Sequence, residues 1–300
     1  MIPEAKGVKL IKIYFYVCKR YDEDLKYQCK RFSNNNQPKL TDQEIMTIYL
    51  FAIQEENRTK VKQIHRFANE YLRPWFPDLG SYAAFNNRIN RLSVAFQQLG
   101  VSLISEFKPA DCSASKSLLD SMPIVVCSGK RSARIATELV DKSYCSTKRM
   151  WYHGLKLHAL GFQREGKMPF PEQLLVTPAS QNDLNVFKQA WSGLTNRQFF
   201  GDKIYADKDF FDRLEAVENS IMFTPVKGIK GQTDWEKQFA KAANDLYSQA
   251  VSAVRQPIES FFNWLIEKTD IQRASKVRST KGLLVHVFGK VAAAFIALIF

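Results

Sequence analysis

The first hundred residues repeat their apolar side chains at the spacing of amphipathic helices. Thr41-Asp-Gln-Glu44 has the form of a capping box, in which a hydroxyl and a carboxylate each satisfy a backbone amide where a helix begins. Further helices are predicted at about 59–72 and from Ser81 through Phe96. The first helix, within residues 8–31, is marked by Leu10, Ile13, Tyr14, Val17, Tyr21 and Leu25.

The pattern changes near residue 110 to short apolar or alternating runs that are typical of strands. The predicted order is three strands, then helix, strand, helix, strand and a long helical region at 234–268, which is the order of the ribonuclease-H-like fold. We therefore predict an α/β protein with a mixed five-stranded ribonuclease-H-like sheet and flanking helices in residues 109–300. A small all-helical region, residues 1–108, precedes it. The strands are expected at 117–126, 151–160, 172–178, 198–202 and 221–225.

Three acidic residues occupy the positions at which that fold carries carboxylates. Asp120 lies on the first strand, Asp202 ends the fourth, and Glu259 lies on the last helix. Mg²⁺ prefers oxygen ligands, and two such ions can stabilise both the attacking and the leaving oxygen in phosphoryl transfer. We expect the three acids to be catalytic and to bind metal, with Asp120 as the bridge. Gly201 would leave room for a phosphate or a neighbouring strand, whereas caps or loops are expected for Asp141, Asp183, Asp207 and Asp209.

The charge favours a polyanionic partner. The chain has 43 Lys and Arg against 30 Asp and Glu, a net charge of +13, which attracts phosphate backbones. The helix at 81–92 is either the DNA-reading helix of a helix-turn-helix or the solvated face of a bundle. Arg255 lies one turn before Glu259 and is expected to face the substrate. The other candidates for DNA or phosphate contacts are Arg88, Arg91, Lys130, Arg131, Lys148, Arg149, Arg273, Lys276, Arg278 and Lys281.

The remaining chemistry-bearing residues give weaker signals. Five cysteines without metal-ligand spacing indicate reduced thiols in a cytosol. The apolar run 285–300 is interrupted by Gly289 and Lys290 and predicts a core helix rather than a membrane span. Packing, rather than contact with DNA, is the preferred interpretation for His153, His158, Trp151 and Tyr152.

Three motifs together resemble the acidic motifs of bacterial insertion-sequence transposases of the DDE type, over roughly residues 40–290. They are Leu119-Asp-Ser-Met-Pro-Ile124, Gly201-Asp-Lys-Ile-Tyr-Ala-Asp207 and Arg255-Gln-Pro-Ile-Glu-Ser-Phe-Phe262. Related elements carry a tyrosine, arginine, glutamate and lysine signature around the third acid. Here Ser252 replaces the tyrosine and Leu265 the lysine, and Lys268 is a candidate substitute for that lysine.

The resemblance implies an enzyme that binds Mg²⁺ or Mn²⁺, two ions in all, and acts on double-stranded DNA. Its substrates would be the terminal inverted repeats of a transposon and a target DNA. Metal-dependent hydrolysis would release a 3′-OH, which would then join the target by transesterification. We expect a homodimer on DNA, no membrane association, and a place in the bacterial cytoplasm with the nucleoid. Two alternatives stay open: a nuclease of the same fold without strand transfer, and a catalytically silent DNA-binding regulator.

Overall fold

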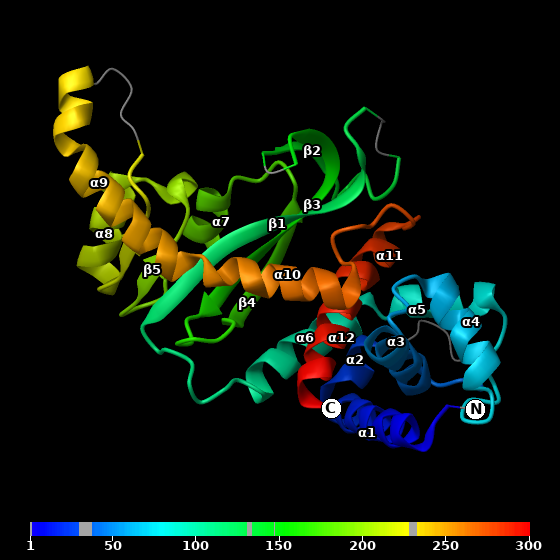
Figure 1. The fold of residues 1–300 in the computed structure, drawn as a ribbon. Helices are drawn as coiled ribbons and strands as arrows, with labels where there is room; N and C mark the ends of the chain where they lie inside the picture. Colours follow the sequence, from blue (N-terminus) through cyan, green and yellow to red (C-terminus); the bar gives the residue numbers. More distant parts are fainter. Residues whose placement is uncertain (1, 30–37, 131–133, 147, 228–232) are drawn as a thin grey trace.

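The N-terminal region is helical. The computed structural model describes residues 2–29, 38–130, 134–146, 148–227 and 233–300 (Figure 1). The predicted capping box is confirmed, because Thr41 accepts from the Glu44 amide while the Glu44 side chain accepts from the Thr41 amide. The polar stretch Ser33-Asn-Asn-Asn-Gln-Pro38, whose sequence predicts a break between helices, falls mostly outside the described residues. The helices are α1 (Glu4–Arg20), continued by η1 (Tyr21–Leu25) and α2 (Lys26–Gln28), then α3 (Asp42–Glu56), α4 (Val61–Tyr71), α5 (Tyr82–Arg91) and α6 (Ser93–Glu106).

A curled mixed sheet follows, and its strand order explains which residues meet. The order is β2-β3-β1-β5-β6, and β4 pairs with the same edge of β3 as β2, farther along that strand. β1 is antiparallel to β3 but parallel to β5, which is parallel to β6. The strands are β1 (Lys116–Ser128), β2 (Asp141–Cys145), β3 (Met150–Phe162), β4 (Phe170–Pro178), β5 (Gln198–Phe200) and β6 (Ile221–Phe223).

The prediction of five strands was wrong by one. β2 lies in the polar, basic stretch between the predicted strands 117–126 and 151–160, and only its pairing with β3 identifies it. Pro123 lies inside β1, where β3 alone pairs with that strand, because β5 reaches only as far as Leu118. A missing N–H is tolerated on an unpaired strand edge.

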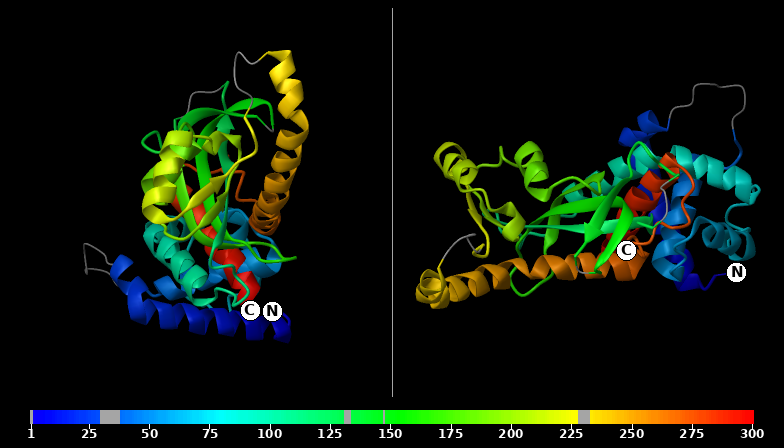
Figure 2. Two further views of the ribbon diagram at one scale, coloured as in Figure 1. Left: turned by 90° about the vertical axis from the view of Figure 1, so that its left-hand side faces the viewer. Right: turned by 90° about the horizontal axis from the view of Figure 1, so that it is seen from above.

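Helices cover both faces of the sheet (Figures 1 and 2). On one face α7 (Asp183–Ala190) and α8 (Lys208–Glu218) pack around Phe187 and Phe199. On the other, α10 (Pro257–Thr269) crosses β1 and buries Ile258, Phe261 and Leu265. α9 (Asp234–Arg255) continues the line of α10 away from the body of the protein, as Figure 2 shows.

The C-terminal segment Thr280–Ile299 is the single described helical stretch that is long and apolar enough to cross a membrane, and 67% of its most apolar window is buried within the protein. It comprises α11 (Thr280–Leu284), η3 (Val285–Gly289) and α12 (Lys290–Ile299), and α12 packs against α3, α6 and α10. The Lys290 ammonium group is buried but donates to the Asp270 carbonyl at 3.0 Å. A carbonyl at the end of α10 therefore compensates the charge that interrupts the apolar run.

Candidate active site

The register of two parallel strands places Asp202 beside Asp120. Leu118 of β1 pairs with Phe200 of β5, and each acid lies two residues farther along its own chain. Neighbouring strands are about 4.8 Å apart. The two carboxylates therefore belong to adjacent positions at one end of the sheet, although β5 itself is only three residues long.

A tight turn holds Asp202 at that position. The Asp202 carboxylate caps the 3₁₀ turn η2 (Lys203–Tyr205) by accepting from the Lys203 amide. The ring of Tyr205 folds back onto Gly201, where a Cβ would lie 2.7 Å from a ring carbon. The glycine thus accommodates a tyrosine, rather than the phosphate or strand that the sequence suggested. The Tyr205 hydroxyl is buried without a hydrogen-bond partner, and burial raises the pKa of Tyr205 well above its usual value.

The third acid comes from the junction between α9 and α10. Gln256 has helical backbone angles, and the Glu259 amide donates to its carbonyl at 2.9 Å. The chain therefore passes Pro257 almost without a break, because proline at the first helical position has no amide to satisfy. Arg255 and Glu259 consequently lie on the same side, one turn apart.

Arg255 joins two of the acids. Its Nη1 lies 3.0 Å from Asp120 Oδ2, and its Nη2 lies 3.1 Å from Glu259 Oε1. The Asp120 side chain is 24% exposed and that of Glu259 52%, so the bridge runs from the sheet to the surface. Burial raises the pKa of Asp120 to about 6, although Arg255 and the Ser121 amide act against the rise; Glu259 and Asp202 raise it further. Asp120 therefore interacts electrostatically with both other acids, and Arg255 bridges it to Glu259.

Two other predicted caps had different outcomes. Asp207 caps α8, as predicted, by accepting from the Phe210 amide. The prediction that Asp183 caps α7 was wrong, because Asn182 accepts from the Leu184 amide. The Asp183 carboxylate instead accepts from Lys156 Nζ at 2.9 Å and from Ser121 Oγ at 3.0 Å. It lies against the opposite face of the sheet from Asp120, since successive residues of a strand point to opposite faces.

Several predicted DNA contacts have partners inside the protein. Arg88 is only 16% exposed and donates to Asp42 Oδ1 at 2.6 Å and to the Leu40 carbonyl, which favours a structural role. Lys148 donates to Gln272. Lys268 lies nine residues after Glu259, or two and a half helical turns, and so points away from it. Arg131 lies outside the described residues, whereas Arg91, Lys130 and Arg149 are exposed.

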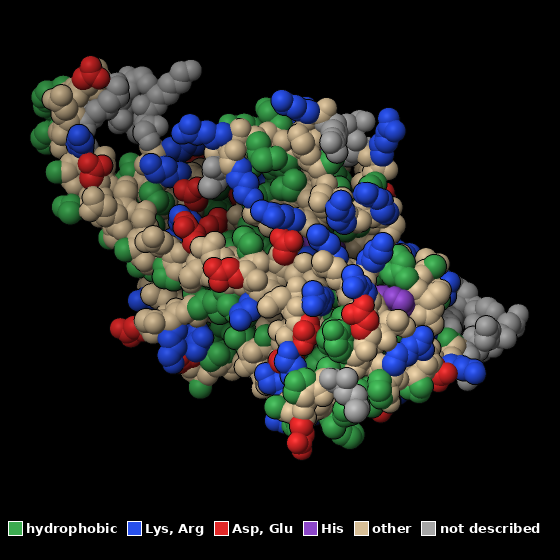
Figure 3. Space-filling model, turned by 45° about the vertical axis from the view of Figure 1, so that its right-hand side comes forward, with side chains coloured by type: hydrophobic (Ala, Val, Ile, Leu, Met, Phe, Trp, Pro, Cys, Tyr) green, Lys and Arg blue, Asp and Glu red, His purple; other side chains and the backbone are tan. Residues whose placement is uncertain are grey.

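Cationic side chains gather on one face of the molecule. Figure 3 shows Lys and Arg side chains in the upper half of this face, around a smaller group of acidic ones. A long anionic ligand would be attracted to this surface.

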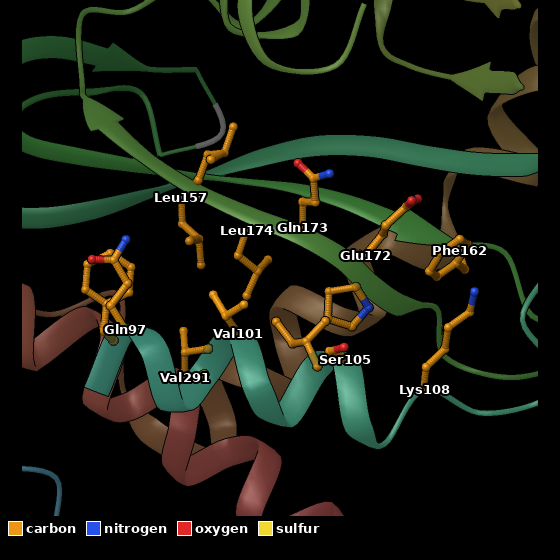
Figure 4. A pocket seen from close by; sticks show the side chains of 15 residues that line it. Gln97, Val101, Ser105, Lys108, Leu157, Phe162, Glu172, Gln173, Leu174 and Val291 are labelled. Atoms are coloured by element: carbon orange, nitrogen blue, oxygen red, sulfur yellow. The ribbon is translucent and has the colours of Figure 1, made fainter. Parts of the chain in front are cut away.

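One cavity of the described residues lies elsewhere. About 560 Å³ of space separates α6 from β4, with Val101 and Ser105 on the helix side and Glu172 and Leu174 on the strand side (Figure 4). None of the three acids lines this cavity. The acids lie instead on an open part of the surface, which suits a long substrate better than a small enclosed molecule.

The described residues contain no group of three His, Cys, Asp or Glu side chains placed to hold a metal as they stand. The donor set is nevertheless suited to Mg²⁺ or Mn²⁺, because all three candidates are carboxylates. The Arg255 guanidinium supplies positive charge between Asp120 and Glu259, the place where a cation would compensate these carboxylates. The residues therefore fit a divalent cation once the guanidinium has moved.

Residues 111–279, more than half of the chain, match the family described as the transposase DDE domain. This range contains Asp120, Asp202, Arg255 and Glu259, together with the whole sheet. No curated protein and no solved structure matches the chain. On this match, the chain belongs to the DDE-type transposases.

Proposed function

We propose that this protein cleaves the ends of an insertion sequence and joins them to target DNA. The observation that carries the proposal is the convergence of Asp120, Glu259 and Arg255 beside the position of Asp202. Asp120 comes from β1 and Asp202 from the turn after β5, whereas Arg255 and Glu259 come from the junction of α9 with α10; all lie within the matched region. Such a cluster on an open basic surface is suited to phosphodiester chemistry on DNA.

The proposed catalytic residues are Asp120, Asp202 and Glu259, which would together hold two divalent cations, Mg²⁺ or Mn²⁺. Asp120 is the candidate bridge because it lies between the other two, on the central strand. When bound, the ions supply the positive charge that stabilises the attacking and the leaving oxygen. The carboxylates fix where that charge lies, and the half-buried position of Asp120 keeps bulk water from screening it.

Arg255 has two roles in this proposal. Without metal, it neutralises part of the charge of Asp120 and Glu259. With metal, it would be released to a DNA phosphate, for which a guanidinium has a suitable fork of donors. The same group would thus stabilise the empty site and then position the substrate. The hydrolysed strand would keep its 3′-OH in place for attack on the target, and no covalent protein intermediate is needed.

The wider architecture follows as part of the proposal. We assign residues 109–300 to a ribonuclease-H-like catalytic domain, and the helices of residues 1–108 to a region that binds DNA. The order of β1 and β3–β6 with the intervening helices supports this fold. Two transposon ends must be brought together before joining, so we propose a homodimer on DNA.

The test is an assay of strand cleavage and joining with the full chain, Mg²⁺ or Mn²⁺, and DNA that carries the element's own ends. Cleavage at the 3′ end together with joined products in a target plasmid would support the proposal. Asp202→Asn and Glu259→Gln should each abolish both steps while circular dichroism shows a folded protein. Asp209→Asn is the matched control, because this nearby acid lies in the first turn of α8, away from the bridge.

Two outcomes distinguish the alternatives. Cleavage without joined products indicates a nuclease of the same family. Specific binding of the ends without cleavage in either metal indicates a regulator that has lost catalysis. If cleavage persists in both acid variants, the assignment of the active site is wrong.

A further inference from the structure

The hairpin of β2 and β3 exposes two aromatic rings. Tyr144 and Trp151 lie directly opposite each other in the strand pairing, with ring centroids 5.4 Å apart and a 58° tilt. Trp151 is 56% exposed and Tyr144 49%, whereas Tyr152, the next residue along β3, is 1% exposed. The prediction of core packing is therefore confirmed for Tyr152 and wrong for Trp151. Large rings left open to solvent at a hairpin are costly unless something covers them.

The surroundings of the pair are cationic. Lys142 Nζ lies 5.5 Å from the centre of the Trp151 ring, within the range of a cation–π interaction. Arg149 is exposed in the hairpin turn, and Arg273 and Lys276 are exposed on the segment that contacts the hairpin through Gln272. The carboxylate of the hairpin itself, on Asp141, already accepts from Ser180 Oγ at 2.6 Å. An apolar protein partner would have to desolvate these cations, whereas a polyanion would pair with them.

The aromatic pair is held in a fixed position. The Gly129 amide donates to the Trp151 carbonyl at 2.8 Å. A Cβ on Gly129 would lie only 2.5 Å from the Cβ of Trp151, so the residue that follows β1 packs closely against the backbone of the tryptophan. The backbone under the ring is therefore fixed by an adjacent strand, which lowers the entropic cost of binding on it.

The pair lies on the same face of the sheet as Asp120. Asp120 is directly opposite Ala159 on β3, and residues opposite each other share a face. Trp151 is eight residues from Ala159 on the same strand, an even number, so its side chain also points to that face. Eight residues of strand span roughly 26 Å, or about eight steps along a DNA strand. The rings thus lie beside the path of a DNA that reaches the acids.

We propose that Tyr144 and Trp151 form a stacking site for unpaired bases in DNA bound at the active site. The inference deepens the proposed function and rests on it for the identity of the polymer. Bases in an intact duplex are stacked on their neighbours and present only their edges, whereas an unpaired base offers a ring face. The site therefore selects DNA with a gap or single-stranded segment about eight nucleotides from the cleaved bond.

The test compares the binding of two DNAs by the full chain without divalent metal. One is an end-containing duplex, and the other is the same sequence with a short gap placed about eight nucleotides from the cleavage site. Wild type should bind the gapped DNA about tenfold more tightly, as expected for stacking of one or two bases. Trp151→Ala should lose that preference, Trp151→Phe should retain most of it, and Tyr144→Ala should reduce it. A 2-aminopurine in the gap should lose fluorescence with wild type but not with Trp151→Ala.

Trp235→Ala is the matched control, because it removes another exposed indole, on α9, and should keep the wild-type preference. The proposal is overturned if wild type has no preference for the gapped DNA or if Trp151→Ala keeps that preference. It is also overturned if Trp151→Ala weakens the binding of the duplex and of the gapped DNA equally. It is also overturned if Trp151→Ala alters only self-association in sedimentation, which would make the rings a protein interface. Asp120→Asn separates the two hypotheses, because it should lose cleavage and keep the preference for gapped DNA. Cleavage that persists in Asp120→Asn refutes the proposed chemistry alone, whereas a wild type that cleaves the ends but has no preference for gapped DNA refutes the stacking site alone.

Discussion

Two aspartates on opposite faces of the sheet pair with basic residues, but their surroundings differ. Asp120 and Ser121 are neighbours on β1 and point to opposite faces. On one face, Asp120 shares Arg255 with Glu259 and lies beside the position of Asp202. On the other, Ser121 donates to Asp183, which also accepts from Lys156.

Charge balance is what separates the two clusters. Asp183 meets one lysine and one hydroxyl, so its charge is compensated, and its side chain is only 12% exposed. On the other face Asp120 and Glu259 share a single arginine beside the position of Asp202, and all three acids are more exposed than that arginine. A buried ion pair whose charges balance, such as that of Asp183, stabilises a fold at most, and we call its side of the sheet the closed face. Exposed carboxylates in excess of their basic partners, as on the other side, or open face, require a cation from solution. The comparison therefore favours a structural role for Asp183 and supports the proposed chemistry for the acids beside Arg255.

The largest expected effect comes from exchanging each aspartate for asparagine. Asp120→Asn should lower metal-dependent cleavage at least about 1,000-fold, a loss of about 4 kcal/mol in transition-state stabilisation. Asp183→Asn should lower it less than about tenfold once the protein is folded, because Asp183 faces away from the acids. Single-turnover cleavage of end-containing DNA measures both. A larger loss for Asp183→Asn would mean that Asp183 also belongs to the active site, and the two faces would then not differ in function.

The next effect concerns stability. Lys156→Met removes the cation that Asp183 needs in its closed position, and we expect a loss of about 3 kcal/mol in the free energy of unfolding. Arg255→Met should cost less, since Asp120 and Glu259 can be solvated where they lie. Urea unfolding, followed by circular dichroism, gives both values. Equal losses would show that the arginine bridge is as structural as the lysine pair.

A pH effect also belongs to the closed face. His158 is fully buried beside Asp183 and hydrogen-bonded to Thr177 Oγ1 at 2.8 Å, and burial lowers its pKa to about 4. In the unfolded chain this histidine binds a proton near pH 6.5. Unfolding therefore takes up a proton between these values, so stability is full above about pH 6.5 and is lost as pH falls toward 4.

At pH 5 this one residue should cost the wild type about 2 kcal/mol relative to neutral pH. His286 contributes with the same sign, because burial lowers its pKa to about 3. The contribution of His158 is therefore isolated by the difference between wild type and His158→Gln, measured by urea unfolding at pH 7 and pH 5. Parallel pH dependences in the two proteins would contradict a neutral buried His158.

Helices and strands could be predicted where the sequence pattern is local. The polar contacts between residues far apart in the sequence could not. Apolar runs gave the strands that carry Asp120 and Asp202, and the Thr41 capping box gave the start of α3. Asn182 and Asp183 are both suited to capping, and only Lys156, 27 residues away in the sequence, determines which one is free to cap.

The same limit explains the strand and the contacts that were missed. β2 has a polar, basic sequence and is defined by its partner β3 rather than by its own pattern. The contact of Tyr205 with Gly201 depends on a turn geometry, and the bridge from Arg255 to Asp120 spans 135 residues. Periodicity shows which side of an element faces the core. It does not show which polar groups meet across the fold.

The smallest expected effect is a change in the affinity of the protein for Mn²⁺ when the basic residue on either face is replaced. Arg255 bonds to both Asp120 and Glu259, so a divalent cation must displace it in the absence of DNA. Arg255→Ala should therefore bind Mn²⁺ about tenfold more tightly than wild type, a gain of about 1.4 kcal/mol, when free Mn²⁺ is measured by electron paramagnetic resonance. Arg255→Lys keeps the charge and should lie between the two, and Lys156→Ala should leave the affinity unchanged because its partner acid is on the closed face. Weaker Mn²⁺ binding by Arg255→Ala would mean that the arginine positions the carboxylates for the metal instead of competing with it. The carboxylates of the open face would then already be arranged for metal binding while Arg255 is bound to them.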